Sequence, residues 1–545
     1  MDTELGWMHA VISVGFLLLV GVQQFHLLIP PDQSLHPQSY EPCDEKCGSF
    51  LGLFPKYKLC QETTSQSLCT AFPHWHQRDH FVSCGDCQFV ESSPESHGEH
   101  DERGILVDFH WEDACSDSPY DYVGTLIFCE QGNGTFGYRS LNDTLPCGSS
   151  SPLLRLRPGL AYQLRLINEA SEPTNLHPHG LYISGEGNAD DITRYAGPGE
   201  CLLYNWTLSD EHLDGTFLYH AHRHNITNHQ VSGGAIGMLF VDTATPQTRP
   251  SWVDREKLLF IQSSKDEDFV NGMPKLHVPL IANTWYRFRI AVGDARGKLR
   301  SLRFDPEQCD VRLVATDGVW RSRGAAAPAF HYEVTGSTRM DLAVACQASS
   351  GIWYRVNSTD DEEPIVVMAV HVSEDVSQLN KLEDWIPPRP SHLQSRANFD
   401  MDDTWNITIS KETGINGYLY DHERPIETFE FGQYHQWRLY NTDRHPFHLH
   451  IYHMQIVTPG GCGNIFEEGE WYDTISADSA VTDHCTVRFH MNAFSGRTVL
   501  HCHQLSHEDL GVMVWTDVIG GPDNSFLQVR SQETAFCEVC ARPLP

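Results

Sequence analysis

Three short segments of the chain share one alternating pattern of apolar and polar residues. They are residues 162–168 (YQLRLIN), 286–292 (YRFRIAV) and 435–441 (HQWRLYN). Successive side chains on a strand point to opposite faces, so this pattern predicts half-buried β-strands. The segments begin 124 and 149 residues apart. Repeats at this spacing indicate tandem units, and we expect three similar β-domains.

Shifts in composition predict where these domains begin and end. The first β-domain is expected at residues 104–242, the second at 251–373 and the third at 401–521. A proline-containing linker precedes residue 251, a polar, proline-rich linker covers 374–400, and 522–545 form a C-terminal tail. Short strands separated by Gly and Pro turns favour β-sandwiches over alternating α/β units. The predicted fold class is therefore all-β.

The N-terminal residues differ in composition from the rest of the chain. Residues 7–22 are almost wholly apolar, and the segment that follows, 23–103, is polar and rich in cysteine. The apolar run is long for a signal-peptide core and short for a membrane span of about 20 residues. We expect residues 1–22 to be a signal peptide or a signal anchor, and the protein to be secreted or held at the cell surface. The cysteine-rich extension is interpreted as a disulfide-stapled cap, a partner-binding module or a stalk.

Cysteine usage supports export. The chain has 17 cysteines; if Cys502 binds a metal, the other sixteen can all form disulfides, as an oxidising compartment allows. The Cys84-Gly-Asp-Cys87 and Cys537-Glu-Val-Cys540 spacings also fit zinc or redox pairs. In an exported protein, structural disulfides are the first expectation. Six N-glycosylation triplets agree with a secreted glycoprotein.

The overall charge excludes one class of partner. Lys and Arg total 38 against 72 Asp and Glu, a formal net charge of −34. Such a chain repels nucleic acid and anionic membrane surfaces, so we expect no nucleic-acid partner. A hydrophobic content of 40% is enough for real cores. We expect a soluble catalytic part that works as a monomer.

Histidines cluster far more than composition requires. With 31 histidines in 545 residues, chance gives about two His-x-His pairs, whereas the chain has six. Four clusters lie in the first and third predicted domains: His177-Pro-His179, His220-Ala-His222, His445-Pro-Phe-His448-Leu-His450, and His501-Cys502-His503 with His507. Each alternation would project two imidazoles from one face of an extended strand. Those two domains are therefore expected to face each other, with the middle domain holding them at the right distance.

Cys502 makes the fourth cluster the most specific of the four. A thiolate between two histidines, with a third histidine five residues beyond, offers soft and nitrogen donors together. This is the donor combination of a blue copper centre. By contrast, a single pair such as His74 and His76 is interpreted as an ordinary surface feature.

In this order and spacing, the clusters resemble the copper motifs of the multicopper oxidase family, which includes laccases, bilirubin oxidases and ascorbate oxidase. The resemblance covers about residues 104–521 and includes softer matches at 269–272 (FVNG), 316–318 (TDG) and 471–474 (WYDT). It implies three tandem cupredoxin-like β-sandwich domains, four copper ions and dioxygen as the electron acceptor. The implied ligands are His445, Cys502 and His507 for type 1 copper; His177 and His448 for type 2; and His179, His220 and His503 with His222, His450 and His501 for the type 3 pair.

The resemblance also implies catalytic carboxylates near the buried metal, because oxygen reduction consumes protons. Glu508, directly after His507, matches a position with that role, and Asp190 is the candidate beside the type 2 site. Asp191 is the alternative to Asp190. His224 and His229 are expected to lie outside the ligand set.

Two residues depart from the family pattern. Val512 occupies the type 1 axial position, where methionine is common, and an aliphatic side chain cannot coordinate. A three-coordinate copper with a raised potential is therefore expected, with Met513 pointing to the opposite face of its strand. Pro178 stands where many members have tryptophan, and little effect is expected because that residue is not a ligand.

The predicted function is oxidation of a small reducing substrate, one electron at a time, through the exposed edge of His507. Phenols and amines, as for laccases, are favoured over Fe(II), Mn(II) or Cu(I). The low methionine count of ten weakens the hypothesis that Cu(I) is the substrate. A copper-binding or adhesion protein without turnover is the alternative from another class. It has no reason to keep a complete oxygen-reducing donor set. A two-domain nitrite reductase would lack the third domain and the histidines on both sides of Cys502.

Overall fold

The computed structural model describes residues 106–521 apart from short gaps, the longest at 357–364 and 477–483, together with four short strands between residues 41 and 83. The chain divides into two units, residues 1–91 and 92–545. In the first, β1 (Glu41–Pro42), β2 (Tyr57–Gln61), β3 (Leu68–Ala71) and β4 (His80–Ser83) form one antiparallel sheet in sequence order. The predicted signal or anchor, most of the cysteine-rich extension and the tail lie outside the described residues. Within those residues, none of the helices has the length and apolar character needed to cross a bilayer.

The second unit begins with a two-sheet sandwich. Its elements are β5 (Glu112–Asp113), β6 (Tyr122–Glu130), β7 (Phe136–Ser140), β8 (Leu154–Leu156), β9 (Ala161–Asn168), β10 (Cys201–Thr207), β11 (Gly215–His220), α2 (Thr227–Ser232) and β12 (Ile236–Val241). One sheet has the order β10-β9-β6-β5 with β7 on β6, and the other β11-β12-β8. Buried residues from both sheets, among them Leu126, Leu164 and Leu239, form one core.

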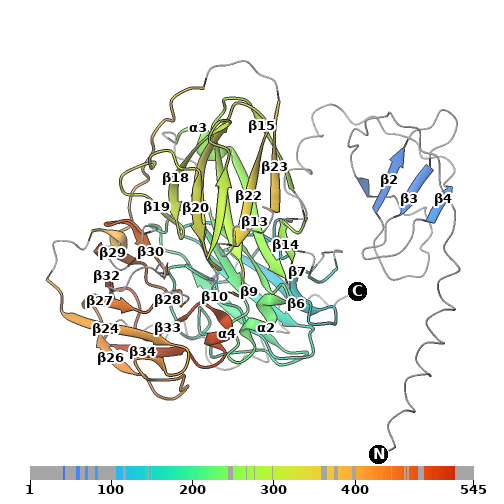
Figure 1. The fold of residues 1–545 in the computed structure, drawn as a ribbon. Coiled ribbons are helices and arrows are strands. Elements are labelled where there is room, and N and C mark those ends of the chain that lie inside the picture. The colour runs from blue at the N-terminus through green and yellow to red at the C-terminus, as the bar shows by residue number, and fades with distance from the viewer. Residues whose placement is uncertain are drawn as a thin grey trace, which may run out of the picture. The chain divides into compact units, whose positions relative to one another are not determined.

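A second sandwich follows along the chain and contributes two larger sheets (Figure 1). It contains α3 (Ser251–Asp254), β13 (Glu256–Ser264), β14 (Glu267–Val270), β15 (Leu276–Ile281), β16 (Tyr286–Gly293), β17 (Arg300–Phe304), β18 (Cys309–Thr316), β19 (Val319–Trp320), β20 (His331–Val334), β21 (Arg339–Cys346), β22 (Ser350–Val356) and β23 (Ile365–Ser373). The sheet orders are β14-β13-β16-β21-β18-β19 and β15-β23-β22-β17-β20.

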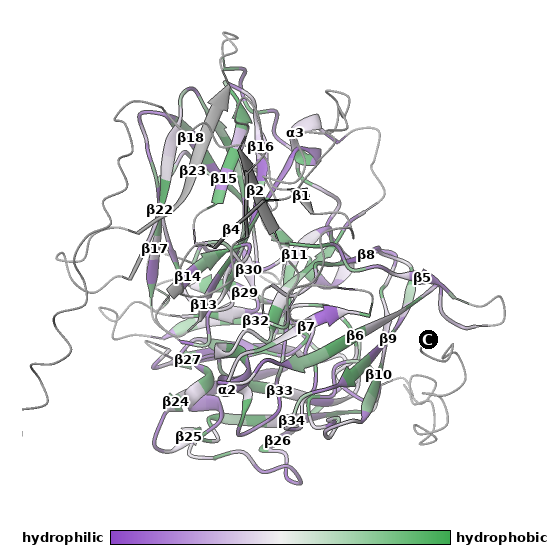
Figure 2. Cartoon of the chain, turned by 90° about the vertical axis from the view of Figure 1, so that its right-hand side faces the viewer, coloured by the Kyte–Doolittle hydropathy of each residue, from purple (hydrophilic) through white to green (hydrophobic). Residues whose placement is uncertain are grey.

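The third sandwich carries the last two histidine clusters. After η1 (Ser391–Leu393) come β24 (Asp403–Ser410), β25 (Gly414–Ile415), β26 (Glu427–Glu430), β27 (Tyr434–Tyr440), β28 (Phe447–Leu449), β29 (Met454–Thr458), β30 (Trp471–Tyr472), β31 (Thr474–Ile475), β32 (Cys485–His490), β33 (Gly496–Cys502), α4 (Leu505–Glu508) and β34 (Met513–Ile519). The sheet orders are β25-β24-β27-β32-β29-β30 and β26-β34-β33-β28-β31. Figure 2 shows hydrophobic colour on many strands and hydrophilic colour on many of the loops between them, as expected for sandwich cores.

The all-β prediction is confirmed, and each sheet of the second unit takes its strands from one of the three predicted domain intervals. The boundaries themselves stay predictions. The three repeat segments are the strands β9, β16 and β27, and β9 and β27 show the predicted alternation of buried and half-buried residues.

For β16 the prediction of a half-buried strand is wrong, because all eight of its residues are buried. The first sandwich covers its polar face. Arg287 Nη2 lies 2.8 Å from Asp214 Oδ1, while Arg289 donates from Nη2 to the Gly215 carbonyl at 2.6 Å and from Nη1 to Asp242 Oδ1 at 2.7 Å. Buried guanidinium groups need such partners, so the polar alternation here marks a domain interface.

Disulfides tie each sandwich of the second unit. The described pairs are Cys129–Cys147, Cys309–Cys346 and Cys462–Cys485, and Cys201 is disulfide-bonded as well. Among the described cysteines, Cys502 is the free one. This agrees with the expectation that Cys502 alone is kept for another task. The two Cys-x-x-Cys motifs lie outside the described residues.

Candidate metal centre

A short backbone pairing in the first sandwich brings the first two histidine clusters together. The His177 amide donates to the His220 carbonyl at 2.8 Å, and the His220 amide donates back to His177 at 3.0 Å. His220 is the last residue of β11, whereas His179 lies in a turn. The prediction of extended strands is therefore wrong at His179, and it is also wrong at His222, His450 and His503, which lie just beyond the ends of their strands. The rings of each pair still lie close, with centroids 5.3 Å apart for His177/His179 and 5.5 Å for His220/His222.

Strand pairing in the third sandwich aligns the other two clusters. In the β28–β33 register His448 faces His501, and the residue before His448 faces Cys502. Ring centroids are 5.0 Å apart for His448/His450 and 5.5 Å for His501/His503. One pair of antiparallel strands therefore places both clusters side by side.

Histidines of the first and third sandwiches then meet, as the sequence predicted. The His177 and His450 rings stack with centroids 4.1 Å apart, and the His179 and His448 rings stack at 3.9 Å. A shared group of eight imidazoles results, made of His177, His179, His220, His222, His448, His450, His501 and His503.

One subset of this group already converges on a point. His501 Nε2 lies 3.3 Å from His222 Nε2 and 3.2 Å from His450 Nε2. Three nitrogens at these distances cannot all carry protons, because their N–H groups would point at one another and repel. They form a group of three donors that could hold one metal ion.

Burial sets the protonation state of the group. Each of the eight side chains is at most 2% exposed. Burial lowers the pKa of the His220 imidazole to about 4 and drives the pKa values of six others well below their usual range, with neighbouring imidazoles as a further cause for each of the six. These seven rings are therefore neutral at pH 7, with lone pairs free for a metal.

Buried nitrogens without hydrogen-bond partners show that the group fits metal ions. Within the described residues these include His177 Nε2, His448 Nε2, His220 Nε2, His179 Nδ1 and both ring nitrogens of His503. A buried polar atom left without a partner costs about 1–3 kcal/mol. Coordination removes that penalty, and imidazole nitrogen is a donor that copper accepts readily.

A second donor group lies around Cys502. Its Sγ lies 3.5 Å from His445 Nδ1 and 3.9 Å from His507 Nδ1, and these two nitrogens are 3.2 Å apart. The short helix α4, which follows β33, places His507 there. Burial raises the pKa of the Cys502 thiol to about 12. A thiolate at this position therefore needs a metal cation to replace its proton.

Val512 and Met513 pack into different apolar clusters, as the sequence predicted. Val512 is fully buried in the same apolar cluster as Cys502, and it joins the site through two backbone hydrogen bonds of 3.0 Å, one from its amide to His507 and one from the Cys502 amide to its carbonyl. Met513 packs in another cluster with Val499. His507 is only 8% exposed, so the edge predicted to meet substrate is small.

Comparison with known proteins identifies this architecture. Two family models, both described as multicopper oxidase, match residues 140–246 and 385–520. Multicopper oxidase mco of Staphylococcus haemolyticus is 23% identical over 424 residues, which cover 72% of this chain and 88% of that protein. The chain belongs to the multicopper oxidase family. It is a copper-dependent oxidoreductase.

Solved structures show the same fold for this multicopper oxidase. A laccase from Pediococcus acidilactici superposes with a TM-score of 0.60 at 20% identity, covering 76% of this chain and 93% of that one. A multicopper oxidase from Campylobacter jejuni, described as a metallo-oxidase, gives 0.59 at 18% identity, covering 76% and 94%. At these identities the likeness concerns the fold.

The two predicted carboxylates of the oxidase both touch the histidine group. Glu508 is fully buried, with Oε1 3.4 Å from His222 Nδ1 and Oε2 3.4 Å from His501 Nδ1. Burial, with Asp509 as the next cause, raises the pKa of the Glu508 carboxyl well above its usual range. Glu508 thus lies behind two of the three converging imidazoles.

Asp190 occupies the matching place on the other side. Its Oδ1 lies 2.7 Å from His177 Nδ1 and its Oδ2 3.4 Å from His450 Nδ1. Burial raises the pKa of the Asp190 carboxyl to about 6. Asp191 instead closes a local turn by accepting the Thr193 amide at 3.0 Å and its hydroxyl at 2.6 Å. Of the two alternatives, Asp190 is the one at the site.

Of the other residues near the oxidase site, two histidines lie outside the donor groups and one carboxylate belongs to them. His224 packs against the ring of Tyr420 at 4.6 Å and His229 against Phe136 at 5.0 Å, and neither belongs to a described donor group. Sequence reasoning missed Asp473, which forms a group with His179 and His448. The motif at 471–474 contains it, but only as a match to the family.

Proposed function

We propose that this chain is an exported oxidase that takes electrons singly from small organic reductants, such as phenols and amines. Four electrons and four protons convert one dioxygen to two waters. The observation that carries the proposal is the division of the donors into a thiolate–imidazole group and a set of eight histidine rings in mutual contact, which His503 joins through its contacts with the rings of His179, His220 and His448. Cys502 belongs to the first group, and its sequence neighbours His501 and His503 belong to the second.

Four copper ions would supply the redox chemistry, one in the thiolate–imidazole group and three among the buried histidines. The proposed type 1 ligands are His445, Cys502 and His507; type 2, His177 and His448; type 3, His179, His220 and His503 for one ion and His222, His450 and His501 for the other. The convergence of the three Nε2 atoms of the last set supports this division. The backbone on either side of Cys502 provides a short covalent connection between the two groups.

Glu508 and Asp190 are proposed to hold and deliver protons. Both are buried, and each lies against the outward nitrogens of two imidazoles. A carboxyl in that position can pass a proton toward the reacting oxygen while the surrounding histidines exclude bulk water.

Exposed apolar side chains near His507 favour an organic substrate. Leu510, three residues further on, is 59% exposed, and Leu419 and Tyr418 are each 50% exposed. Leu510 donates its amide to the His507 carbonyl at 3.1 Å. Exposed apolar side chains that gather in one region mark binding surfaces more often than scattered ones do.

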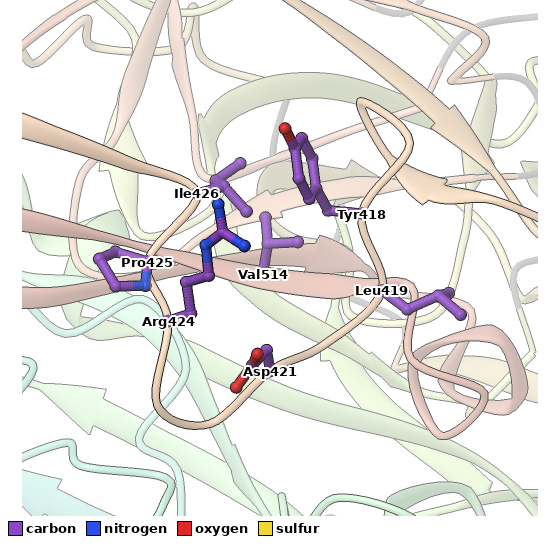
Figure 3. A pocket seen from close by; sticks show the side chains of 7 residues that line it. All are labelled: Tyr418, Leu419, Asp421, Arg424, Pro425, Ile426 and Val514. Atoms are coloured by element: carbon purple, nitrogen blue, oxygen red, sulfur yellow. The ribbon is translucent and has the colours of Figure 1, made fainter.

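A small cavity adjoins this surface, and Tyr418 and Leu419 belong to both. Its volume is about 120 Å³, and it is lined by Tyr418, Leu419, Asp421, Arg424, Pro425, Ile426 and Val514. In Figure 3 the side chains of Ile426, Tyr418 and Val514 surround the same space as the guanidinium of Arg424, and Asp421 lies apart from them. An aromatic ring finds apolar contacts here, with a carboxylate and a guanidinium for orientation.

Oxidation of a metal ion such as Fe(II) is the second candidate. A formal net charge of −34 attracts cations, and the Campylobacter jejuni relative is described as a metallo-oxidase. Export rests on the disulfides of the described sandwiches, which an oxidising compartment preserves. A monomer, secreted or anchored by residues 1–22, is part of the same proposal.

The test measures copper content and oxygen uptake of purified, copper-loaded protein with a phenol and with Fe(II). About four coppers per chain and phenol-dependent uptake are expected. A full copper content without uptake from either reductant would favour the copper-binding protein without turnover. Faster turnover of Fe(II) than of the phenol would favour a metal ion as the substrate.

A pair of variants tests the substrate surface directly. Leu510→Ser should lower kcat/KM for the phenol about tenfold, since one apolar contact is worth about 1–3 kcal/mol in a substrate site, and leave Fe(II) oxidation unchanged. Ile519→Ser is the matched control, because Ile519 is also exposed, at 47%, but ends β34. Equal effects of the two substitutions would contradict an apolar substrate surface at Leu510.

A further inference from the structure

The middle sandwich has no histidine cluster, yet two of its side chains reach Asp473, a residue that contacts the buried histidines. Arg339 opens β21 and is fully buried. Asp317 follows β18 and is 5% exposed. Since β18 and β21 are neighbours in one sheet, with Thr316 facing Met340, the two charged residues emerge side by side from the same edge of the middle sandwich.

Both residues hold Asp473 of the third sandwich. Arg339 donates from Nη2 to Asp473 Oδ2 and from Nη1 to the Ser337 carbonyl at 2.6 Å. Asp317 Oδ2 accepts the backbone amides of Asp473 at 3.2 Å and Thr474 at 3.3 Å. Asp317 Oδ1 lies 3.6 Å from Arg339 Nη1. The middle sandwich thereby fixes the side chain and the backbone of Asp473 together.

Asp473 in turn contacts two histidines of the proposed cluster. Its Oδ1 lies 3.3 Å from His179 Nε2, and its carbonyl lies 2.9 Å from His448 Nδ1. Thr474 Oγ1 donates to Asp473 Oδ1 at 2.9 Å and lies within 3.3 Å of the same two ring nitrogens. With these nitrogens engaged, His179 Nδ1 and His448 Nε2 are the atoms left buried without a partner in the described structure.

The backbone beside His179 makes room for this arrangement. Gly180 has a φ of +91°, and a Cβ at this position would lie 2.7 Å from Asp473 Oδ2 and 3.0 Å from Arg339 Nη2. A side chain there would push the ion pair away from the histidine. The absence of a Cβ at Gly180 lets the Arg339–Asp473 pair pack directly against the turn that carries His179.

We propose that Arg339 and Asp317 are positioning residues of the buried copper site. By fixing Asp473 they determine which nitrogen of His179 and of His448 faces the metal ions. The inference rests on the proposed function, because it presupposes copper at these histidines. The middle sandwich is then a working part of the site as well as a spacer. Loss of the guanidinium would leave the Asp473 carboxylate buried without its cation, free to turn away from His179.

The test compares Arg339→Gln with Arg300→Gln. Arg300 is also buried in the middle sandwich, in β17, and pairs with Asp268 at 3.0 Å and Asp294 at 2.8 Å. Both substitutions remove a buried, paired arginine, so a general loss of stability should affect the two alike. The measurements are copper per chain during titration with a chelator, the type 1 absorption band, and the electron paramagnetic resonance signal of the remaining copper.

For Arg339→Gln the type 1 band should persist, while the other copper ions leave at chelator concentrations about 10–100-fold lower than for the wild type. Their resonance signal should change, and Arg339→Lys should restore part of both properties. Arg300→Gln should match the wild type in copper retention. Equal copper retention and unchanged resonance in Arg339→Gln would overturn the proposal, and so would equal copper loss in both glutamine variants.

A second variant keeps the test decisive if Arg339→Gln does not fold. Asp473→Asn preserves size and removes the charge that Arg339 holds, and it should show the same selective weakening of the buried copper. Wild-type retention in Asp473→Asn would overturn the inference. A wild-type protein that binds copper at Cys502 but none among the histidines would instead refute the proposed function on which the inference rests.

Discussion

Substitution of Glu508 by glutamine tests the delivery of protons separately from the transfer of electrons. The change keeps the shape of the side chain and removes its exchangeable acid proton. Glu508 is fully buried and touches only the outward Nδ1 atoms of His222 and His501 among the proposed ligands, at 3.4 Å each. His507, the proposed entry for electrons, belongs to the other donor group. The substitution should therefore act on oxygen reduction alone.

The expected size follows from what a positioned acid contributes. Proton transfer by a side chain in contact with the reacting site is typically worth about 10²–10⁴-fold in rate. Because Asp190 offers a second buried carboxyl against His177 and His450, we expect the low end of that range, about 10²-fold. The double variant with Asp190→Asn should be slower than either single variant.

Two half-reactions measured by rapid mixing provide the assay. Anaerobic reduction of the type 1 absorption band by a phenol should proceed at the wild-type rate, and reoxidation of the reduced protein by dioxygen should slow. Glu470→Gln is the control, since Glu470 is a buried carboxylate of the same sandwich whose oxygens accept the Ser322 amide at 2.9 Å and its hydroxyl at 2.8 Å. Equal slowing of both half-reactions in Glu508→Gln would refute the proton role.

Three further outcomes are expected. Cys502→Ser should abolish absorption at about 600 nm, the region of copper–thiolate bands, and a surviving band would exclude Cys502 as the type 1 ligand. Val512→Met should lower the type 1 potential measured by redox titration, because a thioether can coordinate where valine cannot; an unchanged potential would show that residue 512 is not axial. Arg289 and Arg155 hold the pKa of Asp242 below its usual range against the opposing effect of burial. The stability from this carboxylate is therefore present above its unfolded pKa, about 4, and is lost as pH falls through the lower folded value. Thermal unfolding of Asp242→Asn should depend less on pH in the acid range than that of the wild type, and parallel curves would contradict this assignment.

The donor clusters could be recognised from sequence because their information is local, whereas the assignment of their residues to individual copper ions depends on the resemblance to the family. The His-x-His pairs, and Cys502 between two histidines, are visible within a few residues of sequence, so each cluster is recognisable without its partner. The fold class follows for a similar reason, since strand alternation is a period of two residues.

What sequence could not supply depends on contacts between distant segments. Arg339 and Asp473 are separated by 134 residues, and nothing next to Arg339 marks it as part of the site. The polar alternation of Arg287 and Arg289 predicted an exposed face, and only the docking of the first sandwich explains their burial. The small exposure of His507 likewise results from packing around α4.

The β28–β33 pairing has a consequence for how the protein acquires its metals. His448 faces His501, and the residue before it faces Cys502, so a single register determines the geometry of both donor groups. A slip of one residue would turn every side chain of β33 to the opposite face of the sheet. The ligands of both donor groups would then be displaced at once, so neither copper site could form. Correct pairing of these two strands acts as a common checkpoint, and an insertion of one residue within β33 should yield a protein that lacks both centres together.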